Sequence, residues 1–113
     1  MNKKIIIFID DLRNPSNYVD VKNNIVKQSF NYNEFVLDIQ DMFDIYGKID
    51  EIWFDHDLGD NPYNGYDCAK FLVTFCESKN IPVPEYHIHS ANPVGRKNID
   101  SYLKSYIKIK KLE

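Results

Sequence analysis

Short apolar runs alternate along the chain with longer amphipathic stretches. Residues 3–10 (KKIIIFID) contain an unbroken β-branched run, which is typical of a strand covered on both faces in a parallel sheet. Three further runs with strand character predict the rest of the sheet. They are residues 25–30 (IVKQSF), 50–55 (DEIWFD) and 81–90 (IPVPEYHIHS).

Helical periodicity fills the segments between these runs. Residues 31–47 contain an apolar stripe, Asn31 and Glu34 have the spacing of a capping box, and Gly47 is a typical helix end. Two later segments have the same helical character, and a proline is favourable at the start of the second. These predicted helices cover residues 66–80 and 93–106.

Two segments depart from this alternation. Residues 11–24 are polar, contain a proline and show no helical stripe, so they predict a long loop in place of a first helix. Residues 107–113 (IKIKKLE) alternate like a short edge strand or form a tail. The order of the other elements predicts one three-layer α/β domain over residues 1–113. Its parallel sheet would have four or five strands joined by right-handed crossovers.

The composition fits one globular domain without a membrane segment. The 113 residues are 43% hydrophobic and 27% charged, and no apolar run approaches the roughly 18 residues of a membrane span. The apolar run after MNKK is too short for a secretory signal, so we expect a cytoplasmic protein. Cys68 and Cys76 lie about 12 Å apart along one predicted helix, so we expect two free thiols.

The charge is unevenly distributed along the chain. Residues 91–113 carry six Lys or Arg and two acids, whereas residues 1–90 carry eight bases and fifteen acids, within a net charge of −3. A mostly acidic body argues against binding to duplex nucleic acid. A small anion held together with a cation fits this distribution better.

The first, third and fourth predicted strands end in polar clusters. Asp10 and Asp11 follow the first strand and Asp55 ends the third, and the carboxyl ends of parallel strands form the ligand-binding edge of such sheets. Carboxylates that lie close together repel unless a proton or a cation neutralises them. Oxygen ligands suit Mg²⁺ or Mn²⁺, which makes these three residues candidate metal ligands. The alternative is that the acids only end strands and cap turns.

Two histidines are candidates for proton transfer. His56 lies between Asp55 and Asp57 and is a candidate general acid or metal ligand. His89 reaches the end of the fourth strand, whereas His87 is expected to pack under a helix; their alternation is also a weak signal for zinc. Three alternative roles are open for Asp57: to orient His56, to bind the metal, or to cap the turn before Gly59.

A candidate phosphate cradle follows the fourth strand. Ser90 and Asn92 precede a predicted helix start at Pro93, and Arg96 lies in its first turn. Exposed backbone N–H groups, the helix dipole and a guanidinium together suit a phosphate. Asn92 also suits a simple N-cap, which needs no ligand, and the two roles are compatible. The chain has neither a Walker-type loop nor a G-x-S-x-G elbow, which argues against P-loop NTP hydrolysis and serine esterase chemistry.

Four motifs together resemble a known family. The segments FIDDLRNP, FDHDLG, NGYD and HSANPVG are similar to the DDxR, DHDLG, GYD and HSANP motifs of a family derived from the response-regulator receiver domain. That family is named for predicted cyclic-phosphate processing. The resemblance spans about residues 5–98, with the motifs in the same order.

The resemblance implies a flavodoxin-like fold with a metal-binding edge. In receiver domains an Asp after the third strand accepts phosphate, a Ser or Thr ends the fourth strand and a Lys lies on the fifth. Asp55 and Ser90 match two of these positions, but Lys108 and Lys110 match the third poorly. The first and last helices of a receiver also have no clear counterpart. We therefore expect a reduced receiver fold.

We derive three candidate functions, in order of preference. The first is metal-dependent hydrolysis or other processing of a cyclic or small phosphorylated nucleotide, with Mg²⁺ or Mn²⁺ as cofactor. The second is a module that binds such a nucleotide without chemistry, and the third is a degenerate receiver phosphorylated on Asp55. For the oligomeric state, the apolar faces of a small open sheet and its expected exposed edge leave a homodimer as an alternative to a monomer. The expected site contains Asp10, Asp11 and Asp55 as metal ligands, His56, His89 and Asp57 as catalytic groups, and Arg13, Ser90, Asn92 and Arg96 as phosphate-binding groups.

Overall fold

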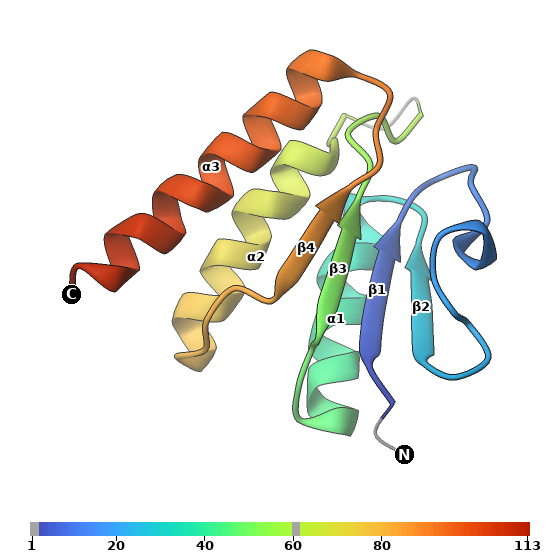
Figure 1. Cartoon of the computed structure of the whole chain (residues 1–113), viewed down its shortest axis with the longest axis horizontal. Coiled ribbons are helices and arrows are strands. Elements are labelled where there is room, and N and C mark those ends of the chain that lie inside the picture. The colour runs from blue at the N-terminus through green and yellow to red at the C-terminus, as the bar shows by residue number, and fades with distance from the viewer. Residues whose placement is uncertain (1–2, 60–61) are drawn as a thin grey trace.

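Four parallel strands form the sheet. The computed structural model describes residues 3–59 and 62–113, and within these ranges the strand order is β2-β1-β3-β4. All neighbouring strands are parallel, and their carboxyl ends lie together along one edge (Figure 1). The expected parallel α/β fold is therefore confirmed. The strands are β1 (Ile5–Ile9), β2 (Ile25–Ser29), β3 (Glu51–Phe54) and β4 (Glu85–Ile88).

Three α-helices in the described ranges connect or follow these strands. Each begins at an asparagine whose side chain accepts hydrogen bonds from backbone N–H groups of the first turn: Asn31, Asn64 and Asn92. A complete capping box is present at α2, where Asp67 reaches back to the backbone of Asn64. The helices are α1 (Tyr32–Tyr46), α2 (Gly65–Lys79) and α3 (Pro93–Lys111).

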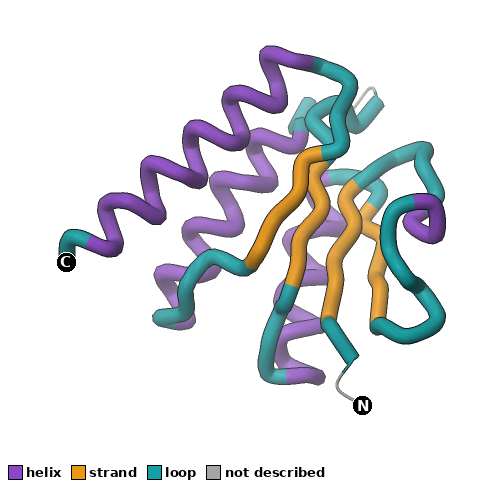
Figure 2. Tube along the Cα trace, viewed as in Figure 1, coloured by secondary structure: helices purple, strands orange, loops and turns teal. Residues whose placement is uncertain are grey.

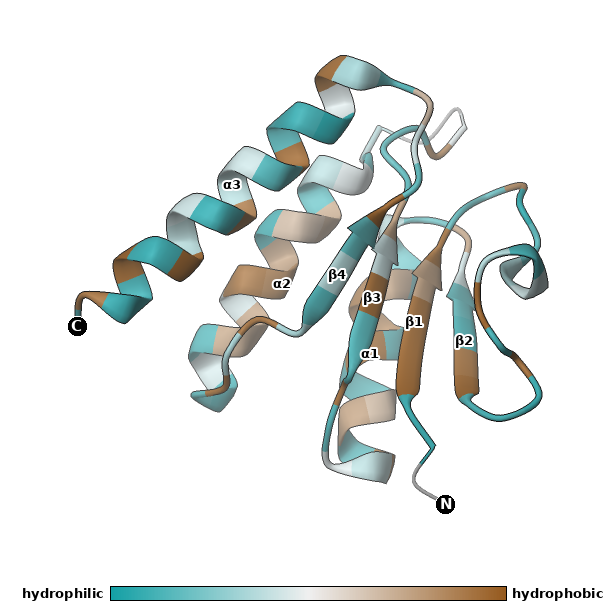
Figure 3. Cartoon of the chain, viewed as in Figure 1, coloured by the Kyte–Doolittle hydropathy of each residue, from teal (hydrophilic) through white to brown (hydrophobic). Residues whose placement is uncertain are grey.

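All three helices contribute to one hydrophobic core on the same face of the sheet. Ile5, Ile7 and Ile9 of β1 point into this core, together with Phe35 of α1 and Leu72 of α2. Figure 3 shows that β1 is apolar along its whole length, as expected for a strand with both faces buried. Cys68 and Cys76 are buried as free thiols in the same core.

A loop rather than a helix covers the other face of β1. The segment between β1 and β2 is irregular apart from the 3₁₀-helix η1 (Pro15–Asn17), as Figure 2 shows. Ile6 and Phe8 are nevertheless 2% and 0% exposed. The ring of Tyr18, from this loop, lies 5.5 Å from that of Phe8. The expected absence of a first helix is confirmed, and the third layer of the domain consists of this loop.

The end of the chain corrects one expectation. Residues 107–111 are the last turns of α3 and not an edge strand, with two residues beyond them. Ile99 and Leu103 are fully buried, and Ile107 continues their spacing of four, which places all three on one face of the helix. Lys110 forms an ion pair with Glu77 of α2 at 3.1 Å.

The receiver lysine has no counterpart at the carboxyl edge of this sheet. In the described part of the chain the sheet has no fifth strand. Lys108 and Lys110 lie near the end of α3, about 24 Å along the helix axis from the residues that begin it. Neither lysine therefore takes the place of the lysine that a receiver carries on its fifth strand.

Within residues 3–59 and 62–113, no helix combines the length and the apolar character needed to cross a membrane.

Candidate functional site

Asp10, Asp55 and His89 converge where β1, β3 and β4 end. Backbone hydrogen bonds fix their positions: Asp10 N donates to Ser29 O, Asp55 N to Ile9 O and His89 N to Phe54 O, at 2.9 to 3.1 Å. One ligand atom from each side chain lies within 4.8 Å of the other two. The three side chains are 1%, 8% and 4% exposed. The sheet therefore brings two carboxylates and an imidazole together in a buried cluster.

Asp10 is saturated with hydrogen-bond donors. Its Oδ1 accepts from the backbone N–H groups of Leu12 and Arg13 at 2.7 and 2.8 Å. Its Oδ2 accepts from His89 Nε2 at 2.9 Å and from Arg13 Nη1 at 3.2 Å. Burial would raise the pKa of Asp10, but the bonds from Arg13, Leu12 and His89 lower it below the usual value. Asp10 is therefore ionised and held in one orientation.

His89 is a buried, neutral imidazole. Its ring stacks on Phe8 with the centroids 4.6 Å apart, and its Nδ1 is buried without a hydrogen-bond partner among the described residues. Burial lowers the pKa of His89 although Asp10 favours the protonated form. An imidazolium would need an acceptor at Nδ1. We therefore assign the tautomer in which Nε2 carries the proton and donates to Asp10.

Asp55 is less well neutralised than Asp10. Burial raises the pKa of its carboxyl group, the neighbouring charge of Asp10 raises it further, and a hydrogen bond from the Ser90 side chain acts in the opposite direction. Arg13 Nη1 lies 3.5 Å from Asp55 Oδ2. Of the two buried carboxylates, Asp55 is the one that an added cation would stabilise most.

Asp11 lies in the wall of the adjacent pocket rather than in the buried cluster. The pocket has a volume of about 380 Å³. Gly59 has a φ of 71°, and a Cβ atom at this position would lie 3.2 Å from Asp11 Oδ2. The expected metal ligand Asp11 is thus beside the cluster, across from a left-handed glycine. The lining residues are Asp10, Asp11, Leu12, Arg13, Asp55, Asp57, Gly59 and Ala91.

His56 lies beneath the start of α3 and outside the buried cluster. Its Nδ1 lies 2.9 Å from Asp57 Oδ1, as expected if Asp57 orients the ring. The side chain of His56 is 16% exposed. A Cβ atom on Gly95 would lie only 2.2 Å from His56 Cγ, so the ring packs directly against the helix backbone. Asp57 also accepts a long hydrogen bond of 3.5 Å from Asn92 Nδ2.

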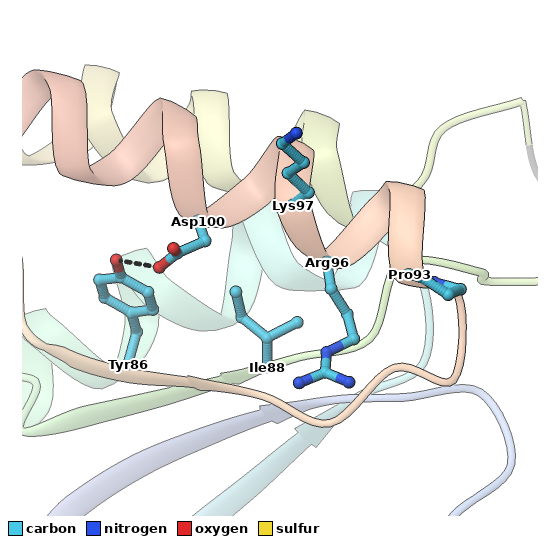
Figure 4. Close-up of a pocket in the computed structure, with 6 residues that line it drawn as sticks. All are labelled: Tyr86, Ile88, Pro93, Arg96, Lys97 and Asp100. Atoms are coloured by element: carbon cyan, nitrogen blue, oxygen red, sulfur yellow. Dashed lines mark hydrogen bonds between the residues drawn. The ribbon is translucent and has the colours of Figure 1, made fainter.

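The four predicted phosphate-binding residues do not gather in one place. Ser90 Oγ accepts from Asn92 N at 3.2 Å, and Asn92 Oδ1 accepts from Gly95 N at 3.0 Å, so Asn92 is the N-cap of α3. Arg13 reaches the buried cluster. Arg96 instead lines a separate pocket of about 540 Å³ between β4 and α3. Figure 4 shows its guanidinium there beside Ile88.

His87 occupies a different environment from the one expected. It lies on the face of β4 without helices, where its ring stacks on Trp53 at 4.3 Å and its side chain is 41% exposed. Glu51 and Glu85 lie near His87, and Lys4 already pairs with Glu51 at 2.7 Å. The expectation that His87 packs under a helix is wrong, because all three helices pack on the opposite face of the sheet.

A family model for the cyclic-phosphate processing receiver domain matches residues 5–105. The chain belongs to this family. The match covers the whole sheet and all three residues of the buried cluster. The resemblance seen in the four motifs is therefore confirmed. Neither a curated protein nor a solved structure matches the chain.

The glycines of two receiver motifs lie at close contacts beside the site, which residue chemistry alone does not reveal. A Cβ on Gly65, in NGYD, would lie 2.0 Å from the carbonyl oxygen of Asp55. Gly65 N also donates to His56 O at 2.8 Å, which ties the start of α2 to the end of β3. Gly95, in HSANPVG, makes room for the His56 ring. In the sequence, only the position of Gly65 and Gly95 within the family motifs indicates that these glycines matter.

Proposed function

We propose that this receiver domain hydrolyses or otherwise processes a cyclic or small phosphorylated nucleotide with the help of Mg²⁺ or Mn²⁺. The observation that supports this function is the convergence of Asp10 and Asp55, both buried, beside a pocket of about 380 Å³. Membership of the cyclic-phosphate processing family supports the class of substrate.

The donor set fits a hard divalent cation. Asp10 and Asp55 would hold the ion, and Asp11 lies in the same pocket wall. Burial and the charge of Asp10 raise the pKa of Asp55, so a cation bound beside it would stabilise its ionised form. A bound divalent ion supplies charge stabilisation on the phosphate and lowers the pKa of bound water.

The chain's own residues would bind the phosphate and move the proton. Arg13 presents a partly exposed guanidinium at the pocket, where it would orient a phosphate oxygen. His56 is the better proton-transfer candidate of the two histidines, because Asp57 orients its Nδ1 and leaves Nε2 as the basic nitrogen. His89 would hold Asp10 in place, since its Nε2 already donates to that carboxylate.

Activity assays with an Asp55 variant test this function. Purified protein is incubated with Mg²⁺ or Mn²⁺ and a panel of cyclic nucleotides, and the products are separated by chromatography. Asp55→Asn should lower turnover by about 100-fold or more, because it removes a charged ligand from the cation and from the phosphate site.

Asp44→Asn is the matched control for this assay, since Asp44 is exposed in the last turn of α1, a helix that begins at the carboxyl edge of the sheet and runs away from it. It should leave turnover unchanged. The proposal fails if no nucleotide is converted, or if Asp55→Asn and Asp44→Asn behave alike.

Binding without chemistry is the second candidate function, and the saturation of Asp10 favours it. Four donors already engage this carboxylate, and one of them is His89, which leaves fewer groups to activate water. Calorimetric binding of a nucleotide that is recovered intact would support this function over hydrolysis.

Phosphorylation of Asp55, the third candidate function, gains no comparable support, because Lys108 and Lys110 lie at the far end of α3.

A further inference from the structure

We propose that Arg13 is a displaceable counter-ion. Its guanidinium bridges Asp10 and Asp55 in the metal-free protein, leaves them when a divalent cation binds, and then contacts the phosphate of the substrate in the adjacent pocket. This inference rests on the proposed metal-dependent function and adds a coupling between cation binding and phosphate binding.

The guanidinium lies where a cation would be most strongly held. Arg13 Nη1 is 3.2 Å from Asp10 Oδ2 and 3.5 Å from Asp55 Oδ2. A single nitrogen therefore bridges the two carboxylates of the cluster. A divalent cation shared by Asp10 and Asp55 would compete for the same two oxygens, and two cations this close would repel each other.

The backbone of Arg13 is fixed independently of its side chain. Arg13 N donates to Asp10 Oδ1 at 2.8 Å, and Arg13 O accepts from Gln28 Nε2 at 3.0 Å. The side chain is 35% exposed, whereas its two acidic partners are 1% and 8% exposed. The guanidinium can therefore swing toward solvent while the loop that carries it stays in place.

The released side chain has an adjacent pocket to enter. Arg13 lines the pocket of about 380 Å³ together with Leu12, Gly59 and Ala91. A guanidinium is well suited to bind a phosphate there, because its fork of donors matches two phosphate oxygens. The coupling is reciprocal: a cation that frees Arg13 strengthens phosphate binding, and phosphate that captures Arg13 strengthens cation binding.

Thermal unfolding with increasing Mn²⁺ tests the displacement without an activity assay. Wild type and Arg13→Met are compared, with Arg96→Met as the control because Arg96 is the chain's other arginine and lines a different pocket. Arg13→Met should melt at a lower temperature without metal, because two buried carboxylates lose their counter-ion. It should then gain more from Mn²⁺ and reach half-saturation at a concentration about fivefold lower than wild type. Arg96→Met should match wild type.

A measurement on the wild-type protein is decisive if Arg13→Met does not fold. Addition of Mg²⁺ should shift the NMR signal of the Arg13 side chain and leave that of Arg96 in place. Equal Mn²⁺ responses of wild type and Arg13→Met, or an unchanged Arg13 signal in Mg²⁺-saturated protein, would overturn the displacement but leave the proposed function standing. Absence of any metal response in all the proteins would overturn both.

Discussion

Asp10 and Asp55 lie side by side but differ in the direction of their pKa shifts. The pKa of Asp10 is lowered because hydrogen bonds from two backbone N–H groups, His89 and Arg13 outweigh the effect of burial. The pKa of Asp55 is raised because burial and the charge of Asp10 outweigh its bond from Ser90. The difference arises from the turn after β1, which aims two backbone N–H groups at Asp10.

The lowered pKa of His89 predicts a loss of stability on mild acidification. A group whose folded-state pKa lies below its unfolded value stabilises the fold fully above the unfolded pKa of 6.5 and loses that contribution as the pH falls through the folded value. The free energy of unfolding, measured by urea denaturation in chelator, should therefore fall as the pH drops below about 6.5. His89→Gln should remove this decline.

His87→Gln is the control for this pH dependence. His87 is 41% exposed on the open face of the sheet, and its replacement should leave the decline intact. Asp10, Asp55 and Arg13 also face the His89 cluster. The raised pKa of Asp55 has the opposite sign, since its ionisation lowers stability as the pH rises. Because the two contributions overlap, the decisive comparison is between variants: a pH profile of His89→Gln with the same slope below pH 6.5 as wild type would contradict the assignment of His89 as a neutral imidazole.

At the level of elements, close approach rather than helix propensity explains the glycines in the first turns of α2 and α3. Gly65 and Gly95 lie in the first turns of these helices, where alanine would have the higher intrinsic helix propensity. A Cβ at Gly65 would meet the backbone of Asp55, and a Cβ at Gly95 would meet the ring of His56. Both helices are thereby held against the loop after β3.

Gly95→Ala should destabilise the protein although it improves helix propensity. The new methyl group would overlap the His56 ring, and overpacking of this kind costs about 1–3 kcal/mol. Urea denaturation of Gly95→Ala, with Ser101→Ala as the exposed control on the same helix, measures the effect.

Combination of Gly95→Ala with His56→Ala should recover part of the lost stability, because the clash involves that side chain. Gly65→Ala should be more damaging and should not be rescued, since it would meet backbone atoms. If Gly95→Ala is as stable as wild type, the close packing of His56 against α3 is wrong.

At the scale of the whole molecule, a loop takes over the role of a helical layer. The helices cover one face of the sheet, and Tyr18 from the loop after β1 covers the centre of the other. Tyr18 lies 5.3 Å from His89 and 6.0 Å from Trp53 between ring centroids. This loop begins at Asp10 and contains Arg13, so the segment that completes the fold also forms one wall of the site.

Tyr18→Ala should therefore destabilise the protein by about 1–2 kcal/mol through lost aromatic packing over Phe8 and His89. Tyr46→Ala is a matched control, because Tyr46 is 41% exposed and Tyr18 is 40% exposed. Urea unfolding followed by the fluorescence of Trp53, the chain's one tryptophan, measures both variants. Equal effects of the two substitutions would contradict a covering role for the loop.

Local pattern was sufficient for the main features of the fold and for part of the site. The β-branched run of β1, the helical stripes and the capping asparagines act over a few residues, so the alternation of strands and helices in a parallel α/β domain and its acidic edge follow from them. The position of Asp10 and Asp55 at neighbouring strand ends follows from the same rule.

Contacts between distant segments decided what the sequence left open. Residues 107–111 alternate like a strand, yet they continue α3 because Ile99, Leu103 and Ile107 share one helical face and Lys110 meets Glu77. Arg13 and Arg96 carry the same side chain, but the loop after β1 brings the first to the carboxylates and α3 holds the second at another pocket. Sequence pattern encodes local conformation and burial, whereas the meeting of Arg13, His89 and Asp55 depends on three strands joined only in the folded sheet.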